Sequence, residues 1–365
     1  MTRHRLKVKK IALLVFCTVL CAWGETRQAV VRLAPTDTNS GDDRFIAFSG
    51  SDANVYRVSP DSVVHRLSLD IHGKSATLQG STGPAVSADY RWIAFTQNHD
   101  LWLCDTSSGA CSQATSLGQP ATSSLASVDV LITAWSANSR ELLLHVTADD
   151  TELADVDVPE LKVRKARYGF YRFKLADHSL ELLKIPDNFE FEAWLPNGEF
   201  IGSLDPILPE QTCRENPLVI VREGASAIPI DANEPPGRLA QVAVSSDGLS
   251  AAMSVYCSRS NFSQIVRYDL ENRAFSSVSA KGEYAEYQWP RFSPSARQLT
   301  WIRSRHAEMK LAQDTLILDD KPVYECLTGI DYSWIDNSRI GLICGSQVIV
   351  IDSTSGKELS KTKIK

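Results

Sequence analysis

The chain has 365 residues, 43% of them hydrophobic, and a formal net charge of -6 at pH 7. This net negative charge argues against nucleic acid as a partner, because the negatively charged phosphate backbone attracts basic surfaces and repels acidic ones. The length suits two ordinary domains or one large repeat fold.

The first 24 residues have the layout of a cleavable secretory signal. Five basic residues between Arg3 and Lys10 precede the uncharged apolar run 11–20, and Ala22 and Gly24 are small residues at the peptidase positions. The apolar stretch 11–23 has 13 residues, whereas a membrane span takes about 20. Cleavage is therefore favoured over a retained anchor. Cleavage removes five positive charges, so the net charge changes from -6 to -11 and 341 residues remain. This mature chain is expected in the periplasm or outside the cell, without a transmembrane span.

One short pattern recurs through the rest of the chain: an apolar residue, a polar turn, often an Arg, and then an apolar strand. The turns are rich in Asp, Asn, Ser and Gly, which tolerate left-handed backbone angles and close hairpins. Steps between copies run from 42 to 59 residues, and a step of about 40–50 residues with four short strands is typical of a propeller. We predict an all-β fold, a single β-propeller of four-stranded blades over residues 25–365, with seven blades and six as the alternative. The copies begin at Ser40 (a degraded one), Val86, Trp135, Trp194, Val244, Phe292 and Trp334.

Three copies of this pattern, Val86–Phe95, Val244–Met253 and Phe292–Trp301, resemble the repeat of the TolB-like propeller family. They are also similar to the repeat in the related propeller of dipeptidyl-peptidase-type proteins. The resemblance implies a periplasmic interaction platform or a gating domain beside a hydrolase. Propellers of the TolB-like family often have six blades, whereas seven units are counted here, so the resemblance leaves the number of blades open.

Six cysteines follow the signal, and an even number in an exported chain favours disulfides over free buried thiols. Cys104 and Cys111 flank a hairpin turn and are expected to face each other across it. Cys213 and Cys257 fall near the loops of consecutive blades and are expected to pair. Cys326 and Cys344 then pair by elimination.

Trp135, Trp194 and Trp334 occupy the same position in their copies of the repeat. A stacking platform for sugars is conceivable. Equivalence within the repeat favours packing between blades instead.

The longest polar segments, residues 147–168, 204–217, 258–263 and 303–314, fall between the second and third strands of their units. Long loops gathered on one face of a rigid scaffold are where binding usually occurs, although neutral variation in loop length is the alternative. The acidic half of the first segment lacks the calcium-loop pattern, and its basic half makes a self-neutralising, solvated insertion the simpler interpretation. The candidate binding residues on this loop face are Asp149, Asp150, Glu152, Asp155, Asp157, Arg164, Arg167, Arg303 and His306.

Chemistry-bearing motifs are sparse. The chain has no Gly-x-Ser-x-Gly elbow, no closely spaced histidine pair and no glycine-rich phosphate loop, so we predict no catalytic residue, cofactor or metal ligand. The expected function is a non-catalytic interaction module that binds a protein, a peptide or an envelope component through the loop face. The alternative is a propeller enzyme of the lyase, hydrolase or cyclase kind, with residues converging at the mouth of the central channel.

Overall fold

The computed structural model describes residues 31–33, 44–47, 55–67, 69–71, 74–76, 84–118, 120, 127–149, 168–186, 188–204, 218–230, 238–257, 262–279, 282–283, 285–305 and 313–363. Every regular element in these residues is a β-strand, as predicted. Among them there is accordingly no helix with the length and apolar character to cross a membrane. The predicted signal, residues 1–24, lies outside the described residues.

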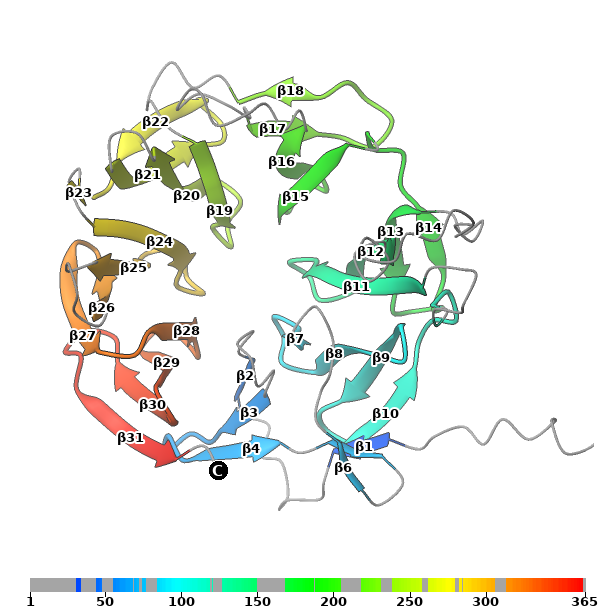
Figure 1. The fold of residues 1–365 in the computed structure, drawn as a ribbon, viewed down its shortest axis with the longest axis horizontal. Coiled ribbons are helices and arrows are strands. Elements are labelled where there is room, and N and C mark those ends of the chain that lie inside the picture. Colours follow the sequence, from blue (N-terminus) through cyan, green and yellow to red (C-terminus); the bar gives the residue numbers. More distant parts are fainter. Residues whose placement is uncertain are drawn as a thin grey trace, which may run out of the picture.

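The strands form antiparallel sheets arranged in a ring, with the first strand of each blade nearest the centre (Figure 1). Six sheets contain a four-stranded blade whose strands follow one another in sequence, numbered here two to seven after their repeat copies. Blades two, three and four consist of β7 (Ala85–Val86), β8 (Trp92–Gln97), β9 (Asp100–Asp105), β10 (Ala110–Gln113); β11 (Ser127–Trp135), β12 (Glu141–Asp149), β13 (Gly169–Lys174), β14 (Leu180–Leu182); and β15 (Phe189–Trp194), β16 (Phe200–Leu204), β17 (Leu218–Val221), β18 (Ile228–Pro229).

Blades five, six and seven complete the larger part of the ring (Figure 1). Blade five has a short extra strand, β23 (Gly282–Glu283), paired with its third strand. The three blades consist of β19 (Arg238–Val244), β20 (Ser250–Cys257), β21 (Phe262–Asp269), β22 (Ala274–Ser277); β24 (Ala285–Phe292), β25 (Leu299–Arg305), β26 (Gln313–Leu318), β27 (Lys321–Cys326); and β28 (Ile330–Trp334), β29 (Arg339–Cys344), β30 (Gln347–Asp352), β31 (Glu358–Lys363).

The degraded first copy of the repeat forms a smaller sheet. Its strands are β2 (Arg44–Ala47), β3 (Val55–Val58) and β4 (Val64–Leu67), and β2 contacts both β28 and β7. The number of four-stranded blades among the described residues is therefore six, which was the alternative count. Where the other copies have an apolar residue before the turn, the sequence of this copy has the polar Asn39, which lies outside the described residues.

The outer edge of blade two is extended by three short strands that the repeat did not predict. β1 (Val31–Leu33) pairs antiparallel with β10 and with β5 (Leu69–Ile71), which pairs with β6 (Lys74–Ala76). Covering β10 in this way removes one unpaired sheet edge, the feature through which strands pair wrongly with other chains.

Hydrogen bonds within the turn explain the repeated Ser-x-Asp/Asn residues. Ser87 Oγ donates to Asp89 Oδ1 at 2.6 Å and accepts from Trp92 N at 2.9 Å. The same bond joins Ser245 to Asp247 at 2.6 Å, and this bond from Ser245 is the main reason that the pKa of Asp247 lies below its ordinary value. Each turn is thus closed by bonds between residues two or five positions apart, which is why the motif can be read from sequence.

The same turns join neighbouring blades. Asp89 N donates to Ser139 Oγ at 3.0 Å, Ser246 Oγ to Pro294 O at 2.7 Å, and Ser295 N to Asn337 Oδ1 at 2.8 Å. Side-chain bonds of this kind fix the rotation of one blade against the next.

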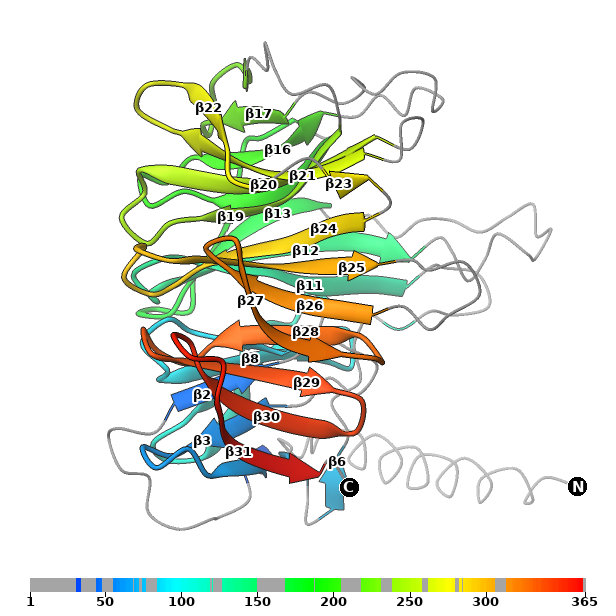
Figure 2. The same ribbon diagram turned by 90° about the vertical axis from the view of Figure 1, so that its left-hand side faces the viewer.

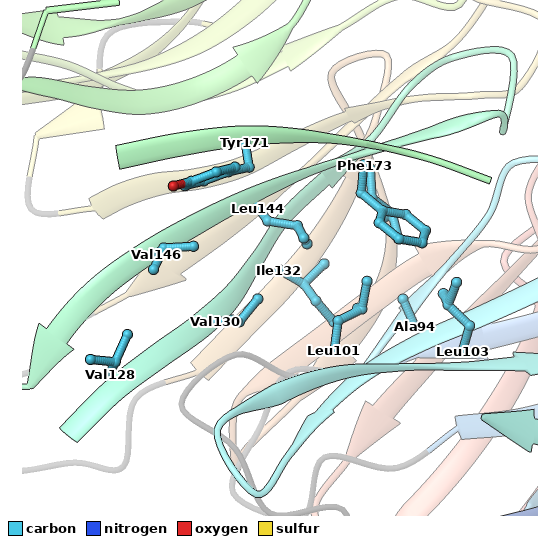
Figure 3. Packing of buried hydrophobic residues seen from close by; sticks show 11 residues of the cluster. Ala94, Leu101, Leu103, Val128, Val130, Ile132, Leu144, Val146, Tyr171 and Phe173 are labelled. Atoms are coloured by element: carbon cyan, nitrogen blue, oxygen red, sulfur yellow. The ribbon is translucent and has the colours of Figure 1, made fainter. Parts of the chain in front are cut away.

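The core lies between the blades, where apolar side chains from facing sheets interdigitate. Figure 3 shows this layer between blades two and three, where Leu101 and Leu103 of β9 meet Val130 and Ile132 of β11. Leu101 and Val130 have no exposed surface. One blade cannot cover both of its own faces, so packing of this kind requires the ring.

The tryptophans that share a repeat position pack between blades, as predicted. Trp334 is 7% exposed, and its indole N–H donates to Thr300 Oγ1 of blade six at 3.1 Å. The indole N–H of Trp135 donates to Ala85 O of blade two at 3.1 Å. Trp194 packs against the apolar cluster shared by blades three and four.

Two of the three predicted disulfides are confirmed. Cys104–Cys111 joins adjacent strands β9 and β10, and Cys326–Cys344 joins the outermost strand of blade six to the second strand of blade seven. Cys213 lies outside the described residues, so the pairing of Cys213 with Cys257 stays a prediction.

His145 of β12 makes stability sensitive to pH. Its ring stacks on Phe170 with 4.4 Å between centroids, and burial lowers the pKa of the imidazole. Protonation is therefore harder in the folded chain than in the unfolded chain, so His145 reduces stability as pH falls below about 6.5. We expect the urea midpoint to fall less between pH 7.5 and pH 5.5 in His145→Phe than in the wild-type protein. Equal falls would show that His145 does not titrate differently on folding.

Candidate functional site

Most of the predicted binding residues cannot be placed. Asp150, Glu152, Asp155, Asp157, Arg164, Arg167 and His306 lie outside the described residues, and Asp149 is described only as the last backbone position of β12. The described strands do confirm that the four long polar segments connect the second and third strands of their blades. The strands β12 and β25, which precede two of these segments, run toward the same side of the ring (Figure 2).

Arg303 is the predicted binding residue whose side chain the structure describes. It is partly buried on β25. Its Nε is buried and has no hydrogen-bond partner within the described part of the chain. The structure brings no second predicted residue beside it, so the loop face stays a prediction.

A different site emerges on the innermost strands. In β11, β15, β19 and β24, the pairing with the second strand of the blade slips by one residue shortly before the turn. Such β-bulges turn a side chain out of the regular alternation and are frequent beside functional sites. The slips fall between residues 132 and 134, 191 and 193, 240 and 243, and 288 and 291.

Trp289, in the bulge of β24, has the largest exposed aromatic ring among the described residues, with 51% of its surface accessible. The other exposed large apolar side chains of the described residues lie on turns, at strand termini or on outermost strands. Both faces of blade six are covered by neighbouring blades, so an exposed side chain on its innermost strand must point toward the ring axis. The backbone of Trp289 has a φ of 54°, a left-handed conformation that is a genuine outlier for a bulky residue.

This strained conformation is held from both sides. Trp289 N donates to Gln241 Oε1 of β19 at 2.8 Å, and Tyr332 of β28 donates its hydroxyl to Trp289 O at 2.6 Å. Burial raises the pKa of Tyr332, so its hydroxyl stays protonated and remains a donor. Strain that the surroundings enforce in this way is concentrated at functional sites.

The orientation of Gln241 follows from its partners. A backbone N–H can only donate, so Gln241 must present its oxygen to Trp289. Ser254 Oγ donates to the same oxygen at 2.8 Å. The amide NH₂ of Gln241 therefore points away from both and is fixed as a donor.

Carboxylates outnumber arginines on the innermost strands. Glu192 Oε2, in the bulge of β15, accepts from Val242 N at 3.4 Å, one residue beyond Gln241. The first strands of the six four-stranded blades contain five carboxylates and two arginines in their sequence, a net charge of -3. They are Asp129, Glu190, Glu192, Glu286, Asp331, Arg238 and Arg291.

A second polar constellation lies where blade two meets blade three. His99 Nδ1, in the β8–β9 turn, is 2.6 Å from Asp129 Oδ1 at the start of β11, and Ser127 Oγ donates to Asp129 Oδ2 at 3.0 Å. A carboxylate holding one imidazole nitrogen orients the ring for proton transfer at the other.

Neither arrangement was predicted from sequence. The tryptophans singled out there were those at the repeated anchor position, whereas Trp289 lies three residues before the anchor Phe292. A tryptophan outside the repeat register was the available signal. His99 and Asp129 are 30 residues apart, and no spacing rule joins them.

No protein-family model and no curated protein matches the chain, and the similarities found are to solved structures. TolB from Acinetobacter baumannii matches over 88% of this chain and 69% of its own, with 13% identity and a TM-score of 0.44. Dipeptidyl peptidase 4 from Porphyromonas gingivalis matches over 100% and 62%, with 14% identity and a TM-score of 0.48. An oligogalacturonate lyase from Vibrio parahaemolyticus matches over 92% and 86%, with 8% identity and a TM-score of 0.49. The TolB-like and dipeptidyl-peptidase-type propellers that the repeat resembles are thus among the solved structures to which this chain is similar in fold.

Proposed function

We propose that this chain is an exported, non-catalytic β-propeller that binds a protein or peptide of the cell envelope. The observation that carries the proposal is Trp289, an exposed indole on an innermost strand whose backbone is fixed by Gln241 and Tyr332. Rigid aromatic side chains supply much contact area for little loss of conformational entropy and dominate the energetics of interfaces.

The location of the protein is part of the same proposal. Two disulfides occur in the described residues, and such bonds persist in oxidising compartments rather than in the cytosol. Periplasm or external medium is therefore the proposed location.

Site-specific photo-crosslinking tests the function. With benzoylphenylalanine at position 289 of the exported chain, we expect a crosslinked product, because the indole position faces the partner. Position 249 is the matched control, since Leu249 is 55% exposed but lies on a turn. A product that Gln241→Leu diminishes supports the proposal, and identical products at 289 and 249 contradict it.

Deletion of residues 150–167 in the same experiment tests the predicted loop face. An unchanged product at position 289 assigns binding to the innermost strands alone. Loss of the product keeps the loop face as a part of the binding surface.

The enzyme alternative has one observation in its favour, the His99–Asp129 pair at 2.6 Å. In that case His99 would be the general base or acid, and His99→Gln would abolish turnover while the crosslink at position 289 persisted.

A further inference from the structure

We propose that the segment bound at Trp289 is basic, with an arginine or lysine side chain lying over the indole face. This inference rests on the proposed function and names the chemistry of the partner at the same site. Among the aromatic side chains, tryptophan attracts cations most strongly through its ring face.

The indole face of Trp289 is open to such a ligand. Within the described residues, no ring or cation lies against it. Arg291, two residues along β24, is already placed over another ring, 5.1 Å from the centroid of Tyr332. Arg44 of the first sheet likewise lies 5.2 Å from the centroid of Tyr90.

The charges around the site favour a cation over an anion or a neutral segment. Arg291 has a carboxylate of Asp331 at 3.7 Å, so its charge is already balanced. The net charge of -3 on the innermost strands would repel an acidic segment. A neutral apolar segment would remove water from Glu192 without replacing it, which is unfavourable for a carboxylate.

The site is also preorganised for one orientation of the ligand. Trp289 is held through its main chain, so its backbone does not have to be ordered on binding. Gln241, which bonds to the main chain of Trp289, supplies an amide donor. Glu192 of the preceding blade supplies a carboxylate at Val242, one residue further along β19. A guanidinium or ammonium group over the indole would face the carboxylate, and the peptide carbonyl beside it would face the amide.

A pair of nearly isosteric peptides tests the charge. The protein is labelled with 5-fluorotryptophan, and the ¹⁹F resonance of Trp289 is identified by its absence in Trp289→Phe. The probes are an acetylated, amidated Gly-Arg-Gly-Arg-Gly peptide and its twin with citrulline in place of both arginines. We expect the arginine peptide to shift the Trp289 resonance with about tenfold higher affinity than the twin, and added salt to reduce that ratio.

Two variants separate charge from general effects. Glu192→Gln keeps a hydrogen-bond acceptor but removes the charge, and it should narrow the ratio to about threefold. Glu271→Gln, on the exposed turn after β21, should leave the ratio unchanged. Equal affinities for the two peptides would overturn the basic partner and leave peptide binding intact. No shift of the Trp289 resonance with either peptide at millimolar concentration would overturn the site itself.

Discussion

Replacing Arg339 with alanine is expected to lower the free energy of unfolding by about 3 kcal/mol. Arg339 lies in blade seven with its side chain 13% exposed and its Nε paired with Asp336 Oδ2 at 2.7 Å. Its Nη1 crosses to the first sheet and donates to Ser59 O at 3.0 Å and to Pro60 O at 3.1 Å. Alanine would remove these charged donors and leave Asp336 without its ion pair.

Arg140 provides the matched control, because it occupies the same position of the repeat in blade three. Its side chain is exposed, so Arg140→Ala should change stability by no more than about 0.5 kcal/mol. Urea unfolding of both variants, followed by tryptophan fluorescence, measures the difference. Equal losses would mean that the contacts of Arg339 with the first sheet contribute nothing to stability.

The contact between blade seven and the first sheet is where this ring closes, and it explains the size of the expected effect. Within the described residues, each blade is built from consecutive strands, so no strand from one end of the chain completes a blade at the other. Closure depends on the apolar cluster in which side chains of β3 and β4 pack against β30 of blade seven. Side-chain bonds add to it: those of Arg339, a bond from Ser360 Oγ to Ser62 O, and a bond from Tyr90 OH to Ile335 O at 2.7 Å.

Sequence reasoning could predict what is local and repeated. The hydrogen bonds of the Ser87–Asp89 turn join residues at most five positions apart, so the residue types in the turn are enough to predict its conformation. The hairpin that joins Cys104 to Cys111 is equally local. The position of Trp334 between blades followed from its equivalence to Trp135 and Trp194.

Sequence reasoning could not predict what depends on register and on contacts between distant residues. The bulge that exposes Trp289 is a slip in pairing between β24 and β25, and apolar alternation does not show which strand slips. Its support comes from Gln241 and Tyr332, which are 48 and 43 residues away. Among the described residues the first sheet has three strands, and a degraded copy of a repeat does not reveal how many strands it forms.

Asp100 illustrates the same limit, because in the sequence it resembles one more turn residue. In the structure it is 5% exposed and accepts hydrogen bonds from Thr115, Gln113 and two backbone amides. Its Oδ1 accepts from Thr115 Oγ1 at 2.7 Å, Leu117 N at 2.9 Å and Gly118 N at 3.0 Å. The chain leaving blade two is thereby held against the β8–β9 turn so closely that a Cβ on Gly118 would lie 2.0 Å from His99 O.

We expect Asp100→Ala to destabilise the protein by about 3–4 kcal/mol, because buried donors would lose their acceptor. Asp100→Asn keeps one oxygen for the amides and should lose about half as much. Asp177→Ala is the control, since Asp177 lies on an exposed turn and accepts from Ser179 N at 3.0 Å. The released amide there can bond to water, so the loss should stay below about 1 kcal/mol. Urea unfolding measures all three variants, and similar losses at positions 100 and 177 would show that burial of the carboxylate does not determine its contribution.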